Sequence, residues 1–308
     1  MNAKAGLRSM RLRTLPLSLA GTVMGVCIAA TVVPQLSRGT WLIFLTTALL
    51  QVLSNLSNEL GDTLHGTDTA DRQGIRYSLQ DGEMTIKEMK YLIAATAFLC
   101  CFSGLAMVWL AFGTLLAAEP LLLLLLGAAA IWAAMHYTLG KNPYGYRGLG
   151  DVFVFIFFGL VSCCGACYVS AHTAGLAEVL KASALPACAI GLFSVGVLNV
   201  NNIRDAATDA ATRTTTAILL GGRRARIYHT VLLTLGWCLM LCFSIVNTAG
   251  AGPLRWFYVL TLPLYILHLK GVWTREGRAL DPMLPLLVLS TFGFSLLGGL
   301  GLLLNLFQ

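Results

Sequence analysis

Two groups of acidic and amide side chains in this chain have a spacing that suits metal and phosphate chemistry. The first contains Asn58 and Asp62, and the second contains Asp205 and Asp209. Residues four positions apart lie on one face of an α-helix, so each pair directs two oxygen-bearing side chains the same way. Neighbouring carboxylates repel unless a cation lies between them, and Mg²⁺ prefers carboxylates together with phosphate oxygens and water. The pairs therefore indicate a magnesium site that holds a diphosphate.

The surroundings of the two pairs strengthen this interpretation. An asparagine precedes each pair by about one helical turn, Asn55 in the first group and Asn201 in the second. One acidic pair alone would be ordinary at a solvated helix end, but two matching pairs are not explained in that way. Guanidinium and ammonium groups bind phosphate oxygens by charge-assisted hydrogen bonds. Basic residues of this kind accompany both groups: Arg72, Lys141, Arg204 and Arg213.

The composition indicates where such a site must be built. Hydrophobic residues make up 57% of the 308 residues and charged residues only 11%, with a mean hydropathy of +0.75. Soluble domains carry about 25% charged residues, so this chain has too few charges to cover a water-facing surface. The apolar runs lack the alternation of barrel strands and predict helices. Nine runs approach the length of a membrane span: 14–34, 41–58, 91–113, 119–137, 152–171, 184–201, 228–248, 254–270 and 283–305.

The expected fold is therefore all-α, a polytopic membrane bundle of about nine transmembrane helices that forms a single domain over 1–308. Of the 21 lysines and arginines, 18 lie on one side of this arrangement, which predicts a cytoplasmic N-terminus. Every acidic residue except Glu119 and Glu178 lies on the same side, so we expect a catalytic cap there. Basic residues placed beside spans favour contact with membrane lipid, and nucleic acid is not an expected partner.

The two motifs resemble those of the UbiA-type aromatic prenyltransferases, N-D-x-x-D and D-x-x-x-D at the ends of the second and sixth helices. Within that family, the Lys141–Asp151 stretch is typical of enzymes that act on 1,4-dihydroxy-2-naphthoate in menaquinone synthesis. The chain departs from the family pattern at Glu59, where aspartate is usual, and at Arg213, which lies one position before the usual lysine. Four stretches carry the resemblance: 11–16, 53–72, 141–151 and 201–209.

The resemblance implies a Mg²⁺-dependent transferase of the bacterial cytoplasmic membrane. Its substrates would be a polyprenyl diphosphate and an aromatic acid. The diphosphate would leave as an allylic carbocation forms, and the naphthoate ring would attack that cation. The ring would then lose its carboxylate as CO₂ at the same carbon, giving demethylmenaquinone.

The resemblance also assigns roles to individual residues. The Mg²⁺–diphosphate site would use Asn58, Asp62, Asp205 and Asp209, with Asp68 and Asp71 as further metal ligands. Phosphate oxygens would be bound by Arg72, Lys141 and Arg204. Arg11 would bind the carboxylate of the aromatic acid, and Tyr144 and Tyr146 would shield the cation from water.

Two alternatives remain open at the level of sequence. One is a family member with another aromatic acceptor, such as 4-hydroxybenzoate, because acceptor choice is weakly encoded. The other is a cation-coupled secondary transporter, in which the paired acidic groups would bind the coupling ion. Transporter sites lie near the middle of the bilayer on broken helices, whereas these groups lie at the ends of apolar runs.

Overall fold

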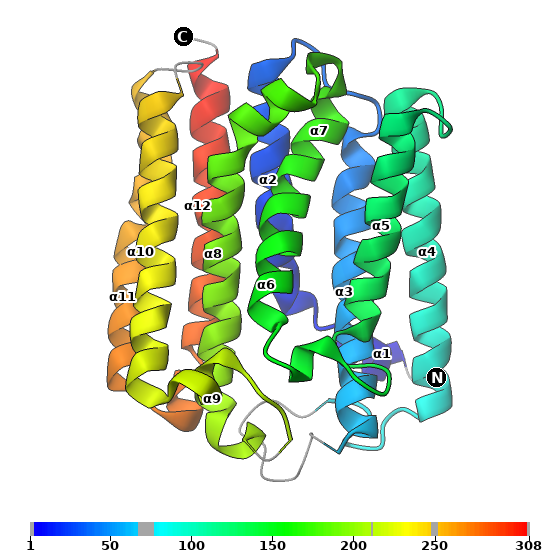
Figure 1. Ribbon diagram of the computed structural model, residues 1–308, viewed down its shortest axis with the longest axis vertical. Coiled ribbons are helices and arrows are strands. Elements are labelled where there is room, and N and C mark those ends of the chain that lie inside the picture. Colours follow the sequence, from blue (N-terminus) through cyan, green and yellow to red (C-terminus); the bar gives the residue numbers. More distant parts are fainter. Residues whose placement is uncertain (1–2, 67–76, 211, 248–251, 307–308) are drawn as a thin grey trace.

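The protein is described by a computed structural model over residues 3–66, 77–210, 212–247 and 252–306, and these form a bundle of long helices without a β-strand (Figure 1). The prediction of an all-α bundle is confirmed. The long helices are α2 (Leu15–Val32), α3 (Thr40–Leu64), α4 (Ile86–Phe112), α5 (Ala118–His136), α8 (Leu176–Asp209), α10 (Gly222–Val246) and α12 (Met283–Asn305). The segment between α5 and α8 contains α6 (Gly150–Val154), the π-helical η3 (Phe155–Cys164) and α7 (Gly165–Ala171).

Eight helical segments in the described residues are long and apolar enough to cross a membrane. The remaining predicted run, 254–270, folds as the 3-10 helix η5 (Pro253–Thr261) followed by α11 (Leu262–Thr274). Pro253 and Pro263 lie within the first two positions of these two helices, where proline is tolerated because its missing N–H has no helical partner anyway. About nine membrane helices therefore agree with the structure, with the eighth divided into two pieces.

The helices pack as two groups joined by α2. One group is α3 with α4 and α5, and the other is α8 with η3, α10 and α12, while α2 packs on both α3 and α8. Small residues allow close approach, because a Cβ on Gly25 or Gly159 would collide with η3 or α8 backbone respectively. Outside the bundle, large apolar side chains such as Phe98 and Leu125 are exposed, as expected for lipid-facing surfaces.

Both sequence motifs lie at the same end of this bundle. Helix α3 extends past the predicted limit at residue 58 as far as Leu64, and α8 extends past residue 201 as far as Asp209. Each motif therefore belongs to the last turns of a long helix. We call the end of the bundle at which α3 and α8 finish the motif end (Figure 1).

Three connecting segments cover the motif end. Residues 137–149 contain the short 3-10 helix η2 (Tyr144–Tyr146), and residues 212–221 contain α9 (Thr216–Leu220). The two segments pair through the backbone, because the N–H of Thr214 donates to the carbonyl of Tyr146 over 2.9 Å.

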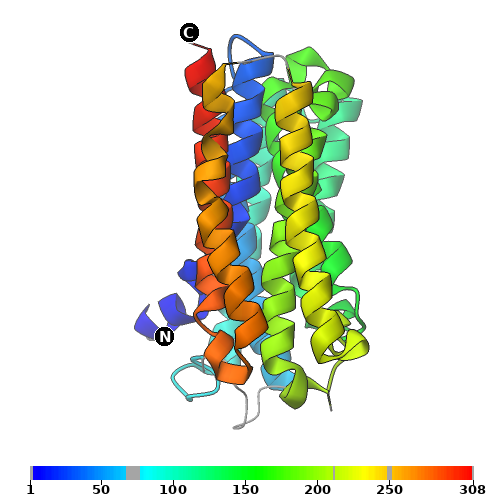
Figure 2. The same ribbon diagram turned by 90° about the vertical axis from the view of Figure 1, so that its left-hand side faces the viewer.

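The third segment, 77–85, packs against α1 (Ala3–Ser9), which projects sideways out of the bundle near this end (Figure 2). Ser78 donates to the carbonyl of Ala5 over 2.8 Å, and Arg8 pairs with Asp81 and Glu83. The amino-terminal segment is thereby held against the loop that precedes α4.

Candidate active site

The first motif is held by the segment that follows α5. Asp62 is only 3% exposed, and Asn58 is partly buried beside it on α3. The hydroxyl of Thr138 lies 3.3 Å from Oδ1 of Asn58. Gly61 makes this approach possible, since a Cβ at that position would collide with Thr138. The glycine inside the motif therefore lets the 137–149 segment pack directly on the end of α3.

Tyr146 joins that segment to the first motif. Its hydroxyl donates to Oδ1 of Asp62 over 2.7 Å, and its ring meets His65 edge to face at a centroid distance of 5.3 Å. A hydrogen bond to an ionised carboxylate is stronger than one between neutral groups and fixes the direction of the carboxylate. Tyr146, predicted as part of the cap, thus lies directly on a predicted metal ligand.

Arg213 lies between the second motif and Tyr146. Its Nη2 donates to Oδ1 of Asp209 over 2.8 Å, and Asp209 is 2% exposed. The guanidinium carbon lies 5.9 Å from the centre of the Tyr146 ring. Burial acts to lower the pKa of Arg213, but the hydrogen bond to Asp209 and the charges of Asp62 and Asp209 raise it overall. A cation therefore lies within the electrostatic reach of both motifs.

Asp205 has a different environment from Asp209. Both of its carboxylate oxygens accept hydrogen bonds from Arg204, at 2.8 Å and 2.6 Å. Arg204 also donates to Asn201 and to Asp281, each over 2.9 Å, and so ties α8 to the segment before α12. Because the two side chains are hydrogen-bonded to each other, phosphate binding by Arg204 and metal binding by Asp205 stay predictions. Asp281 carried no local signal in the sequence.

Glu59 is fully buried, and its Oε1 accepts the backbone N–H of Leu79 over 2.9 Å. This residue therefore anchors the 77–85 segment to α3.

The other residues of the Lys141–Asp151 stretch separate into two environments. Tyr144 donates its hydroxyl to the carbonyl of Ala133 over 2.7 Å and stacks on Phe153, so it packs between α5 and α6. Lys141 is exposed at the motif end. The sequence predicted the same role for Tyr144 and Tyr146. In the structure the hydroxyl of Tyr146 donates to the motif residue Asp62, whereas that of Tyr144 donates to the backbone of α5.

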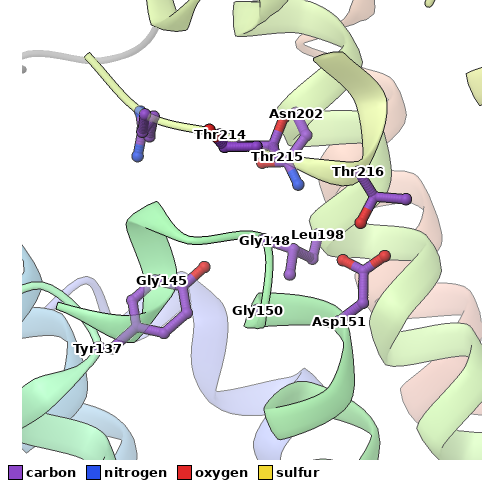
Figure 3. A pocket seen from close by; sticks show the side chains of 11 residues that line it. Tyr137, Gly145, Gly148, Gly150, Asp151, Leu198, Asn202, Thr214, Thr215 and Thr216 are labelled. Carbon is purple, nitrogen blue, oxygen red and sulfur yellow. The ribbon is translucent and has the colours of Figure 1, made fainter. Parts of the chain in front are cut away.

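A small pocket lies at the motif end, and Arg213 is one of the residues that line it. Figure 3 shows this pocket from close by. Tyr137 and Asp151 extend into it from one side, and Asn202, Thr214 and Thr216 line the other. Burial raises the pKa of Tyr137 to about 12, and a phenol is protonated at neutral pH even at its ordinary pKa, so this hydroxyl is a hydrogen-bond donor. Sequence reasoning gave Tyr137 and Asp151 no role, although Asp151 closes the stretch that carries the family resemblance.

Tyr228 supports this pocket from α10. Its hydroxyl donates to Oδ2 of Asp151 over 2.9 Å, so it holds the carboxylate at the start of α6. No local pattern marked Tyr228, because its contact joins two residues that lie 77 positions apart in the chain.

Arg11 occupies the amino-terminal side of the motif end. Its backbone has a φ of 50°, the one positive value among non-glycine residues in the described ranges. Its guanidinium carbon lies 3.6 Å from the centre of the Tyr77 ring, whose hydroxyl accepts a 2.8 Å bond from Arg13. The neighbouring segment is fastened to α3, because Asn55 donates to Met10 and Thr14 over 2.9 Å each. An unusual backbone conformation is thus held in place around Arg11.

The residues present fit a magnesium–diphosphate site. Asp62 and Asp209 are buried carboxylates from two different helices, and buried charges require compensation by a cation or by hydrogen bonds. Asn58 adds an amide oxygen, so the predicted ligands among the described residues are all oxygen donors, the kind that Mg²⁺ prefers. Asp68, Asp71 and Arg72 lie outside the described residues, so their predicted roles are unaffected by this geometry.

Solved structures of similar fold come from two archaea. The apo structure of a UbiA homologue from Aeropyrum pernix aligns with a TM-score of 0.72 at 18% identity, covering 96% of this chain and 99% of that one. The structure of a UbiA homologue from Archaeoglobus fulgidus, bound to DMAPP and Mg²⁺, aligns with a TM-score of 0.60 at 15% identity, covering 95% and 99%. These similarities support the fold.

Sequence comparison is more specific. A 1,4-dihydroxy-2-naphthoate octaprenyltransferase of Escherichia coli is 38% identical over 305 residues, which cover 98% of this chain and 96% of that protein. The profile of the UbiA prenyltransferase family matches residues 18–281, which include both acidic motifs. The chain therefore belongs to the UbiA prenyltransferase family.

Proposed function

We propose that the protein transfers a polyprenyl group from polyprenyl diphosphate to 1,4-dihydroxy-2-naphthoate, releasing diphosphate and CO₂ and forming demethylmenaquinone. The observation that carries the proposal is the series of contacts from Asp62 through Tyr146 and Arg213 to Asp209, which brings the two family motifs together. The Escherichia coli relative is named as an octaprenyltransferase that acts on 1,4-dihydroxy-2-naphthoate, which is the same reaction class and the same acceptor.

In this proposal Asn58, Asp62, Asp205 and Asp209 hold Mg²⁺ and the diphosphate, with Asp68 and Asp71 as further ligands. When bound, Mg²⁺ neutralises charge on the diphosphate and makes it a better leaving group. The similar archaeal structure with DMAPP and Mg²⁺ supports this use of the metal. The Tyr146 hydroxyl fixes the orientation of Asp62 before the substrate arrives.

Basic residues at the motif end bind the charged parts of the substrates. Arg72, Lys141 and Arg204 contact diphosphate oxygens, and Arg11 binds the carboxylate of the naphthoate. Arg11 suits that role because its guanidinium already rests on Tyr77, and stacking leaves the edge of a guanidinium open to a carboxylate. Tyr146, together with Tyr144 and the Phe153 ring on which Tyr144 stacks, excludes water from the cation that forms when the diphosphate leaves.

The membrane location follows from the substrate chemistry. A polyprenyl tail has a large apolar surface, whose transfer into water is unfavourable, so it stays among the apolar helices while its diphosphate head lies at the motif end. We place the motif end on the cytoplasmic side of a bacterial cytoplasmic membrane, since 18 of 21 basic residues lie on that side of the spans. The whole of 1–308 acts as one catalytic domain.

The test is a turnover assay on the full chain purified in detergent. It supplies 1,4-dihydroxy-2-naphthoate and a radiolabelled polyprenyl diphosphate, with Mg²⁺ or with a chelator, and 4-hydroxybenzoate as a competing acceptor. The proposal expects Mg²⁺-dependent transfer to the naphthoate with one CO₂ released per prenyl group transferred.

Two outcomes would change the proposal in different ways. Transfer to 4-hydroxybenzoate alone would keep the reaction class and overturn the acceptor. Absence of transfer to either acceptor, in protein whose far-ultraviolet circular dichroism is that of a folded helical bundle, would overturn the transferase activity itself.

A further inference from the structure

Tyr146 belongs to a stretch of chain that has little stiffness of its own. We call residues 144–151 the glycine strip, because Gly145, Gly148 and Gly150 lie within it. Glycine loses more conformational freedom on folding than any other residue, so such a strip does not hold a side chain in place by itself. Gly148 has a φ of 76°, in the left-handed region that residues with a Cβ rarely adopt. The direction of the Tyr146 side chain therefore depends on what the strip is fastened to.

The first fastening lies near the start of the strip and is made by backbone. The carbonyl of Tyr146 accepts the N–H of Thr214 over 2.9 Å, and the N–H of Gly145 donates to the carbonyl of Tyr137 over 2.9 Å. A Cβ on Gly145 would collide with Tyr137, so the strip lies directly on that residue. These contacts determine where the strip begins, but they leave its other end to be held by something else.

The second fastening lies at the end of the strip and is made by the side chain of Asp151. Tyr228 of α10 donates its hydroxyl to Oδ2 of Asp151 over 2.9 Å, and the hydroxyl of Thr216 also hydrogen-bonds to this carboxylate. Figure 3 shows the Thr216 side chain directed at the carboxylate. Hydrogen bonds to a carboxylate are stronger than those between neutral groups. Asp151 therefore joins the end of the strip to α9 and α10.

The two fastenings act on the hydrogen bond between Tyr146 and Asp62. Thr214 holds the strip at Tyr146, and Thr216, two positions further along the same segment, holds it at Asp151. Loss of the Asp151 contacts would leave one end of the strip free to tilt. A hydrogen bond weakens steeply as its angle departs from linearity, so a small tilt would weaken the 2.7 Å bond from Tyr146 to Asp62.

We infer that Asp151 is a positioning residue for the proposed transfer reaction. Its bonds to Tyr228 and Thr216 hold the glycine strip in place. The strip in turn keeps the hydroxyl of Tyr146 on Asp62. This inference rests on the proposed function, in which Asp62 is a metal ligand, and it deepens that function by adding a residue that lies outside both acidic motifs.

Tyr228→Phe tests the inference, because it removes one hydroxyl and keeps the ring. A double-mutant cycle measures kcat/KM for the polyprenyl diphosphate in the wild type, Tyr228→Phe, Tyr146→Phe and the double variant. Tyr228→Phe should lower kcat/KM about fivefold in the wild type but less than about twofold in the Tyr146→Phe background, where the hydroxyl to be positioned is absent. A merely structural role would lower both by the same factor. That result, or no loss in the wild type, would overturn the inference.

A second measurement does not depend on activity. Hydrogen–deuterium exchange of the full detergent-purified chain, read by mass spectrometry, reports local opening of the peptides that cover 144–151 and 212–216. In Tyr228→Phe these peptides should exchange at least about threefold faster than in the wild type. Unchanged exchange would contradict the inference. A wild type that transfers no prenyl group would overturn the proposed function, whereas the exchange rates would still decide whether Asp151 holds the glycine strip.

Tyr258→Phe is the matched control. The hydroxyl of Tyr258 is buried and lies 2.9 Å from Oγ of Ser244, in η5 at the opposite end of the bundle, so the substitution removes a hydroxyl of the same kind. It should leave kcat/KM within about twofold in both backgrounds and leave exchange of the glycine strip unchanged. Asp151→Asn, which keeps the shape of the side chain and removes its charge, should reproduce both effects of Tyr228→Phe. Its failure to do so would assign those effects to α10 and overturn the inference.

Discussion

Tyr146 and Asp62 lie 84 residues apart in the chain, yet the phenol donates to the carboxylate over 2.7 Å. The bond joins the loop after α5 to the end of α3, and Tyr146 also carries the backbone contact to Thr214 beyond α8. One residue therefore connects the end of α3 to the segment that follows α8. Its hydroxyl and its backbone make separate contributions, and substitution can separate them.

Tyr146→Phe should lower kcat/KM for polyprenyl diphosphate about tenfold to a hundredfold, the equivalent of one hydrogen bond to a charged group. The ring and the backbone contact to Thr214 remain, so the cap should stay in place. Steady-state kinetics at saturating naphthoate measure the effect. Tyr91→Phe on the exposed face of α4 makes the same chemical change and should leave kcat/KM unaltered. Equal rates for Tyr146→Phe and wild type would show that the hydroxyl does not orient Asp62 for catalysis.

Asp62→Ala and Asp209→Ala should each abolish turnover, because each removes a carboxylate from the proposed metal site. Neither side chain contributes to the apolar packing of the helices, so both variants should insert into the membrane and elute from a sizing column as the wild type does. Asp209→Ala should also lower the free energy of unfolding, because it leaves the nearly buried guanidinium of Arg213 without its partner. Calorimetry with Mg²⁺–pyrophosphate should show no binding. The matched control is Glu178→Ala at the opposite end of the bundle, where an exposed carboxylate pairs weakly with Lys181. Substantial activity in Asp62→Ala or Asp209→Ala would contradict the metal assignment.

Asp205 should differ from Asp62 in its effect on stability. Its removal leaves the buried guanidinium of Arg204 without its bidentate partner. Asp205→Ala should therefore lower the free energy of unfolding by about 3 kcal/mol, and it should also abolish activity. Asp281→Ala removes a half-exposed partner of Arg204 and should cost about 1 kcal/mol or less. Denaturant unfolding monitored by circular dichroism measures both values. A fully stable but inactive Asp205→Ala protein would assign Asp205 to the metal alone.

The sequence predicted the features that depend on local pattern. Apolar runs and basic-residue bias were sufficient for a helical membrane bundle, and i, i+4 spacing was sufficient to pair Asn58 with Asp62 and Asp205 with Asp209. These follow from helix geometry and from the absence of water in a bilayer, so they need no knowledge of tertiary contacts.

The remaining features depend on contacts between distant segments. The sequence could not predict that Arg204 also donates to Asp281, because the two residues lie 77 positions apart. The hydrogen bond from Arg213 to Asp209 was equally hidden, since a charge four residues from Asp209 does not reveal whether it folds back onto that carboxylate. The π-helical turns of η3 also had no local signal, since the same apolar sequence reads as an ordinary α-helix.

Arg11→Gln should raise KM for 1,4-dihydroxy-2-naphthoate at least about tenfold while changing KM for the polyprenyl diphosphate less than about twofold. A guanidinium-to-carboxylate hydrogen bond is worth about 1.5–3 kcal/mol, and the glutamine cannot supply its charge. Arg13→Gln is the matched control, because Arg13 donates to the hydroxyl of the same Tyr77 and the substitution removes the same charge. Steady-state kinetics with each substrate varied in turn give both KM values. An equal rise in both KM values for Arg11→Gln would indicate disruption of the amino-terminal segment, and a rise confined to the diphosphate would move Arg11 to the phosphate site.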